Sequence, residues 1–134
     1  MSRPLVCDAS ALVALLLDDG PDGRWVATRL AGSVLHAPAL VHFETANIIR
    51  RTELAGLVGV DQAAQAHADL LDLSMTQWPY EVIAERAWQL RYNLTSYDAS
   101  YVTVAELIEA PLVTLDLRIS RVPQLRCPVA VPGP

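Results

Sequence analysis

Two acidic residues follow apolar segments at opposite ends of the chain. Asp8 follows the apolar run at residues 5–7, and Asp116 follows a second run at residues 112–115. If both runs are parallel strands of one sheet, both carboxylates lie at its carboxyl edge, where open α/β sheets bind ligands. Two neighbouring carboxylates repel each other unless a cation lies between them. The pair therefore indicates a cation site.

Glu44 and Asp98 could complete this site, although each acid also has an ordinary structural interpretation. Glu44 lies on a predicted helix among apolar neighbours, where a carboxylate needs a partner unless it faces solvent. Asp98 begins another predicted helix, so capping alone would explain it. Asp8 and Asp116 could likewise close a strand or cap the next helix. Four convergent carboxylates would suit Mg²⁺ or Mn²⁺ rather than zinc, and such a site favours phosphodiester hydrolysis.

The composition predicts one globular domain over residues 1–134. Hydrophobic residues make up 52% of the chain, and the formal net charge of −5 gives no general affinity for nucleic acid. The chain has no lysine, which excludes a Walker A phosphate site and Schiff-base chemistry. Cys7 and Cys127 lie in apolar runs and are expected to be reduced thiols of a cytoplasmic protein. No run is long enough to cross a membrane, so no membrane association is expected.

Strand and helix patterns alternate along the chain, which predicts an α/β fold with a mostly parallel sheet. Strands are expected at residues 5–7, 34–37, 75–78, 112–115 and 129–131. Helices are expected at residues 11–17, 24–30, 39–54, 61–73 and 80–94, from 98 to before Pro111, and in a short turn at 117–122. On the helix at 39–54, the inward side is expected to carry Leu40, Phe43, Ala46, Asn47 and Ile48.

Four short motifs, in this order and spacing, resemble those of PIN-domain nucleases. They are VCDAS at 6–10, ETAN at 44–47, YDASY at 97–101 and TLD at 114–116. The likeness covers nearly the whole chain and is closest to the VapC-type toxins of bacterial toxin–antitoxin modules. The resemblance implies a PIN-like three-layer sandwich and a metal-dependent endoribonuclease that leaves 5′-phosphate and 3′-hydroxyl ends.

The resemblance also assigns roles to individual residues. It places four acids as the catalytic and Mg²⁺- or Mn²⁺-binding set: Asp8, Glu44, Asp98 and Asp116. Ser10, Asn47 and Thr114 match polar positions that support the carboxylates or a metal-bound water. Some relatives carry a further acid after the last motif, whereas this chain has LRIS at 117–120. The number of metal ions, one or two, therefore stays open.

RNA is the substrate that this interpretation implies, and RNA must approach an acidic pocket. Arg118 and Arg121 follow Asp116 and could offset the repulsion, or they could be solvated surface charges. The resemblance further implies a homodimer and a cognate VapB-type antitoxin whose tail lies in an apolar groove. The candidate groove residues, which could equally be core, are Leu12, Leu15, Leu16, Trp25, Leu40 and Phe43. A catalytically silent PIN-like module that binds RNA or protein is the alternative function.

Overall fold

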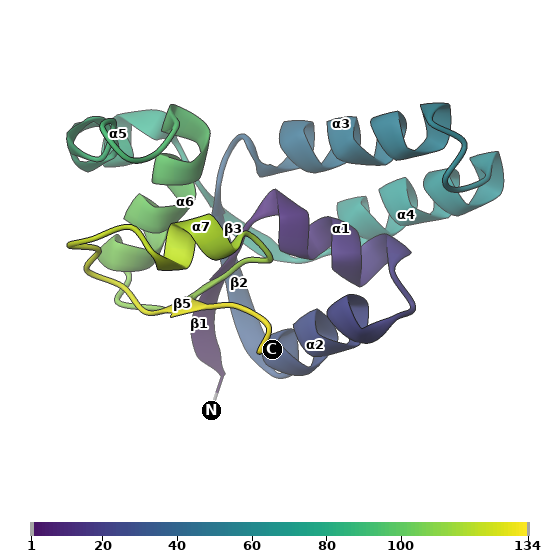
Figure 1. Ribbon diagram of the computed structural model, residues 1–134, viewed down its shortest axis with the longest axis horizontal. Coiled ribbons are helices and arrows are strands. Elements are labelled where there is room, and N and C mark those ends of the chain that lie inside the picture. Colours follow the sequence, from purple (N-terminus) through teal and green to yellow (C-terminus); the bar gives the residue numbers. More distant parts are fainter. Residues whose placement is uncertain (1, 134) are drawn as a thin grey trace.

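The computed structural model describes residues 2–133, and within them the chain forms one five-stranded sheet and seven helices (Figure 1). In chain order these are β1 (Arg3–Cys7), α1 (Ala9–Leu17), α2 (Pro21–Leu30), β2 (Ser33–Pro38), α3 (Val41–Leu54), α4 (Val60–Asp72), β3 (Met75–Trp78), α5 (Tyr80–Gln89), α6 (Ser96–Leu107), β4 (Leu112–Val113), α7 (Leu117–Ser120) and β5 (Val129–Ala130). No helix in this part of the chain is both long and apolar enough to span a bilayer.

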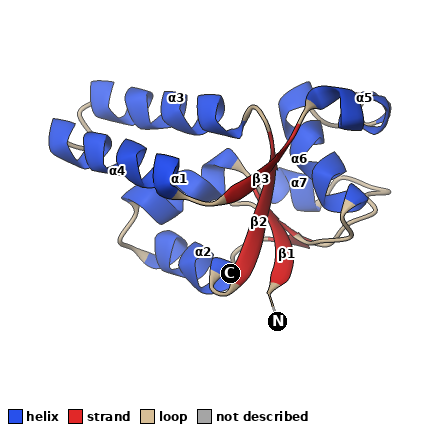
Figure 2. Cartoon of the chain, turned by 180° about the vertical axis from the view of Figure 1, so that it is seen from behind, coloured by secondary structure: helices blue, strands red, loops and turns tan. Residues whose placement is uncertain are grey.

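The sheet is parallel throughout and has the strand order β3-β2-β1-β4-β5. Figure 2 shows α1 to α4 on one side of the sheet and α5 to α7 on the other. Parallel neighbours need such crossover connections, because a tight turn cannot join strands that run in the same direction. The predicted α/β sandwich of three layers is therefore confirmed.

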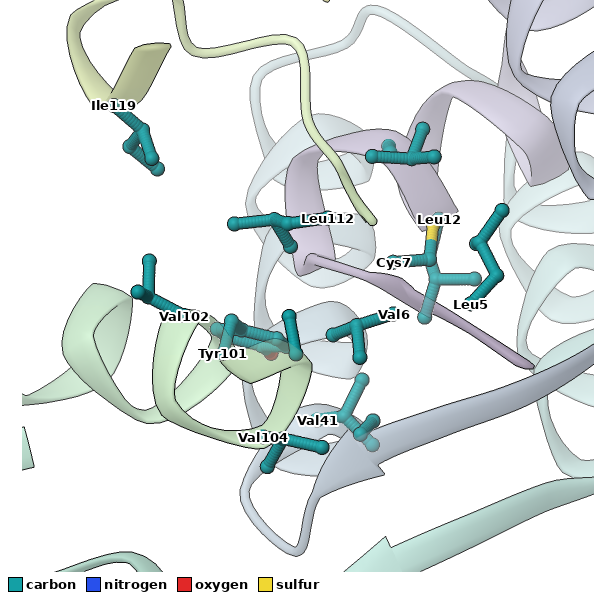
Figure 3. Close-up of a cluster of buried hydrophobic side chains, with 14 of the residues drawn as sticks. Leu5, Val6, Cys7, Leu12, Val41, Tyr101, Val102, Val104, Leu112 and Ile119 are labelled. Atoms are coloured by element: carbon teal, nitrogen blue, oxygen red, sulfur yellow. The ribbon is translucent and has the colours of Figure 1, made fainter. Parts of the chain in front are cut away.

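The core lies where α6 packs on the central strands. Residues 99–105 of α6 are all buried, which is typical of a helix enclosed on every side. Figure 3 shows Tyr101, Val102 and Val104 of this helix beside Val6 of β1 and Leu112 of β4. Because this helix is fixed by burial, the position of its first turn is fixed as well.

The predicted inward side of α3 is wrong within the helix itself, although Leu40, the N-cap residue, does pack against the core. The buried residues are Val41, Thr45 and Ile49, which recur every fourth residue, whereas Phe43 is 81% exposed. The sequence pattern failed because α3 carries apolar residues on more than one side. The stripe with the small Thr45 at its centre is the one that meets the neighbouring helices.

The helix predicted at residues 80–94 is shorter than expected. Helix α5 ends at Gln89, and a turn follows in which the Leu94 N–H donates to the Leu90 carbonyl at 3.1 Å. Both leucines are buried, so a turn supplies the apolar spacing that had indicated continued helix. Cys7 and Cys127 do not form a disulfide, as expected.

Candidate functional site

Parallel pairing of β1 with β4 brings Asp8 and Thr114 together at the carboxyl edge of the sheet. Cys7 lies opposite Val113 in the register, and the Asp8 N–H donates to the Val113 carbonyl at 3.2 Å. The Thr114 hydroxyl donates to Oδ2 of Asp8. Asp8 is only 5% exposed, so its side chain is almost entirely enclosed by the protein.

The second carboxylate oxygen of Asp8 is also fixed. Oδ1 accepts hydrogen bonds from the Ser10 hydroxyl at 2.7 Å and from the Ala11 N–H at 3.0 Å. The second of these bonds makes Asp8 the N-cap of α1, so the capping interpretation and the site interpretation both hold. Burial raises the pKa of Asp8 despite the bonds from Thr114 and Ser10, and the charge of Asp98 adds to the rise.

Ser10 and Thr114 also tie the Asp116 segment to Asp8. The Ser10 hydroxyl accepts the Leu115 N–H at 3.2 Å, and the Thr114 hydroxyl accepts the Asp116 N–H at 3.0 Å. Each hydroxyl therefore donates a hydrogen bond to the Asp8 carboxylate and accepts one from a backbone N–H of residues 115–116. Two of the three residues that the sequence placed in supporting positions, Ser10 and Thr114, therefore lie between Asp8 and the Asp116 segment.

Glu44 approaches the same edge from the first turn of α3. Its Oε1 accepts a hydrogen bond from the Tyr101 hydroxyl at 2.7 Å, and Tyr101 is 1% exposed. Burial raises the pKa of Glu44, the Tyr101 bond opposes that rise, and the charges of Asp98 and Asp8 reinforce it. Sequence reasoning gave Tyr101 no role, although its position three residues after Asp98 places both on one side of a helix.

Asp98 does not cap its helix, which corrects one of its two interpretations. Thr95 is the N-cap of α6, and its hydroxyl accepts the Asp98 N–H at 3.1 Å. Asp98 stands in the first turn, so its carboxylate is not used for capping. Burial raises the pKa of Asp98, and the negative charge of Asp116 contributes.

Asp116 differs from the other three acids because it has its own cation. Its Oδ2 accepts from Nη2 of Arg118 at 2.7 Å, and its Oδ1 accepts from Nε at 3.0 Å. The Arg118 bond holds the pKa of Asp116 below its usual value. The same Oδ1 accepts the Arg118 N–H at 3.0 Å, so Asp116 also caps α7.

The four acids therefore lie along one edge of the sheet, on two strand ends and two helix starts. The charge of Asp98 contributes to the raised pKa of Asp8 and of Glu44, and the charge of Asp116 contributes to the raised pKa of Asp98. Within residues 2–133, however, no three or more Asp, Glu, His or Cys side chains are grouped tightly enough to hold a metal ion. Hydrogen bonds engage the carboxylate of Asp8, and the ion pair with Arg118 engages the carboxylate of Asp116.

The donor set nevertheless fits a divalent cation. All four side chains offer only carboxylate oxygens, which are the ligands that Mg²⁺ and Mn²⁺ prefer. Three of the four pKa values are raised, in each case by burial and by the charge of a neighbouring acid. A cation at this edge would remove that repulsion.

Two further predicted residues are not joined to the acids. Asn47 lies nearly one turn after Glu44 on α3, and its side chain is exposed. Arg121 follows α7 and is exposed as well. In the part of the chain that the structure describes, neither side chain forms a hydrogen bond or ion pair with any of the four acids. Their supporting and RNA-binding roles stay predictions.

Comparisons with known proteins identify the family of this chain. The family model described as the PIN domain matches residues 5–125, a span that contains all four acids. Ribonuclease VapC9 of Mycobacterium tuberculosis is 39% identical over 127 residues, which cover 95% of this chain and 97% of the relative. Ribonuclease VapC12 of the same organism is 37% identical over 117 residues, covering 87% and 90%.

A solved structure gives the same result for the fold. PAE2754 from Pyrobaculum aerophilum superposes with a TM-score of 0.63 at 28% identity, covering 96% of this chain and 92% of that one. Sequence family, close relatives and architecture thus agree over nearly the whole length. The chain belongs to the PIN domain family.

Proposed function

We propose that the protein is a divalent-metal-dependent endoribonuclease that acts as the toxin of a type II toxin–antitoxin pair. The observation that carries the proposal is the hydrogen-bonded placement of Asp8 at the carboxyl edge of the sheet, with three further acids coupled electrostatically to it or to one another: Glu44, Asp98 and Asp116. Membership of the PIN family and relatives named VapC ribonucleases support RNA as the substrate.

In this proposal Asp8, Asp98 and Asp116 hold Mg²⁺ or Mn²⁺, and Glu44 contributes through a second ion or by orienting the attacking water. When bound, the cation activates water and stabilises the charge that develops on the phosphate. In-line attack on the scissile phosphate leaves a 5′-phosphate and a 3′-hydroxyl.

The protein's own residues supply orientation. Thr114 and Ser10 fix both oxygens of Asp8, so this carboxylate needs no reorganisation when the substrate arrives. The Tyr101 hydroxyl partly offsets the rise in the pKa of Glu44 and orients its carboxylate. The remaining oxygen of Glu44 can then accept a hydrogen bond from water and direct it toward the phosphate.

The test is cleavage of a mixed RNA pool by purified protein that is free of any antitoxin. We expect cutting in Mg²⁺ or Mn²⁺, none with a chelator, and 5′-phosphate ends on the products. Equal cutting with and without chelator would contradict metal dependence. A folded protein that binds RNA but cuts nothing would instead favour the silent binding module.

Arg118 is proposed to serve RNA and to compete with the metal. Its side chain is 84% exposed and pairs with Asp116, so an incoming cation must displace the guanidinium. Once displaced, Arg118 lies beside the acids and can offset their repulsion of RNA phosphates.

Replacing Arg118 with alanine should therefore have opposite effects on the two ligands. Affinity for Mn²⁺ should rise about two- to fivefold, since the lost ion pair is exposed and weak. RNA binding should weaken, and its salt dependence should fall by about one charge. Calorimetric titration measures the Mn²⁺ affinity, with Arg121→Ala as the control. RNA binding at several salt concentrations measures the affinity for RNA and its salt dependence. Unchanged or weaker Mn²⁺ binding by Arg118→Ala would show that the ion pair does not compete.

We also propose a cognate antitoxin as the partner, a homodimer as the assembly and the cytoplasm as the location. Trp88 and Tyr92 are 58% and 80% exposed and suit a contact with a second copy. Of the candidate groove residues, Leu12 is fully buried and belongs to the core, whereas Phe43 is exposed and free to meet an antitoxin. The free thiols of Cys7 and Cys127 fit a reducing compartment.

A further inference from the structure

An apolar pocket of about 210 Å³ opens beside the acidic edge. It lies where the chain leaves β2 for α3 and leaves β3 for α5, two connections that Figure 2 shows near one end of the sheet. Aromatic and aliphatic side chains form most of its wall, principally Leu40, Trp78, Tyr80, Ile83 and Tyr97. The pocket is not used by the proposed chemistry.

Two residues that line the pocket are close in the sequence to two of the acids. Tyr97 directly precedes Asp98 on α6, which puts their Cα atoms about 3.8 Å apart. Leu40 directly precedes α3, the helix whose first turn carries Glu44. A second hollow, of about 150 Å³, is lined by Asp98, Asp116 and Arg118. The first turn of α6 therefore lines both an acidic hollow and an aromatic pocket.

Two polar side chains of the pocket wall are paired within the protein. The Trp78 indole N–H donates to Nδ1 of His36 at 3.1 Å, which holds the ring in place. The Ser100 hydroxyl donates to the Ser96 carbonyl at 2.7 Å. No charged residue lines the pocket among the residues that the structure describes. Such a wall offers no counter-charge for a phosphate and suits an uncharged ring.

Two aromatic rings stand at the mouth of the pocket. Tyr80 is 48% exposed and Tyr97 is 61% exposed, although both carry large apolar surfaces. Exposed aromatic rings beside a polyanion-cutting site have the chemistry of a stacking platform, on which unpaired bases of single-stranded RNA are held. Stacking accepts any base, because every base has a flat face.

We propose that this pocket receives a nucleobase of the RNA substrate, stacked on Tyr97, while the neighbouring phosphate lies at the acids. The inference rests on the proposed ribonuclease function and adds a subsite to it. The pocket selects for an unpaired base and for ring size, because its wall is mostly apolar and carries no charge. RNA that is cut must therefore be single-stranded at this position.

The first arm of the test measures binding without cleavage. An unstructured RNA 12-mer carrying 2-aminopurine is titrated with full-length protein in chelator, and quenching of its fluorescence reports stacking. Tyr97→Ala removes the platform, and Ala39→Trp fills the pocket from an exposed position on its wall. Both variants should bind about tenfold more weakly and lose most of the quenching. Leu71→Ala, a change at an exposed apolar residue of α4 outside the pocket, should behave as the wild type.

The second arm measures cleavage of RNA in which single nucleotides lack their base. In the wild type, an abasic nucleotide next to the cut phosphate should lower kcat/KM about tenfold, and Tyr97→Ala should abolish that penalty. Equal penalties in both proteins, or unchanged quenching in both pocket variants, would overturn the inference. Intact RNA binding with lost inhibition by antitoxin would overturn it too and assign the pocket to a protein. Pocket-dependent binding without any cutting would sink the proposed function and leave the subsite standing.

Discussion

Replacing Asp8 with asparagine is expected to lower the rate of RNA cleavage on the order of a thousand-fold. Asp8 is the acid that the fold holds most rigidly, with both oxygens fixed and the side chain 5% exposed. Asparagine keeps the shape and can still cap α1, but it removes the charge that attracts a cation. Initial rates on one RNA at saturating Mg²⁺ measure the effect. A loss of less than tenfold would remove Asp8 from the site.

The same variant should stay folded. The pKa of Asp8 is raised in the folded protein, so between the unfolded and folded pKa values the folded state binds more protons. The folded protein therefore loses stability as the pH rises and Asp8 ionises. At neutral pH the buried charge of Asp8 is destabilising. Metal-free Asp8→Asn should consequently melt at the wild-type temperature or above it. Asp61→Asn, at an exposed acid on α4, is the control that should leave cleavage unchanged.

Replacing Gly23 with alanine should destabilise the protein by about 3 kcal/mol, which lowers Tm by roughly 10 °C for a domain of this size. Gly23 is buried in α2 where that helix crosses the end of α1. An added Cβ would lie 1.7 Å from the Asp18 carbonyl oxygen and 2.8 Å from that of Ala14. Both neighbours are backbone atoms, so the two helices must separate to admit a methyl group.

The sign of this prediction opposes simple helix propensity. In an exposed helix, alanine would be favoured over glycine by about 1 kcal/mol. Thermal unfolding followed by circular dichroism therefore distinguishes the two effects. Gly59→Ala serves as the control, because its Cβ would meet nothing within 4 Å. A Gly23→Ala variant as stable as the wild type would mean that α2 does not pack on α1 as described.

The sequence was sufficient to place the strands, most clearly β1 and β4, which are short buried apolar runs followed by a polar residue. Met75–Trp78 has the bounds expected for it, and it is an edge strand of the sheet. Helix faces were harder to predict. On α3, apolar residues occur on several sides, and only packing against α1 and α4 selects Val41, Thr45 and Ile49.

The acids at the strand ends could be anticipated because parallel strands end at one edge, and their supporting hydroxyls came from the motifs. Long-range partners could not be anticipated. Tyr101 reaches Glu44 across 57 residues of sequence, and only the packing of α6 against the sheet brings them together. The pairing of Arg118 with Asp116 was also missed, since a sequence cannot show whether an arginine faces RNA or the acid beside it.

The most direct test of a shared metal centre is a calorimetric titration of the metal-free protein with Mn²⁺, beside Asp98→Asn. Asp98 is the acid that couples the other three electrostatically, while its backbone rather than its side chain completes the cap of α6. We predict saturable binding by the wild type and at least a tenfold loss of affinity in the folded variant. Equal affinity in both proteins would show that the four acids do not form one metal site.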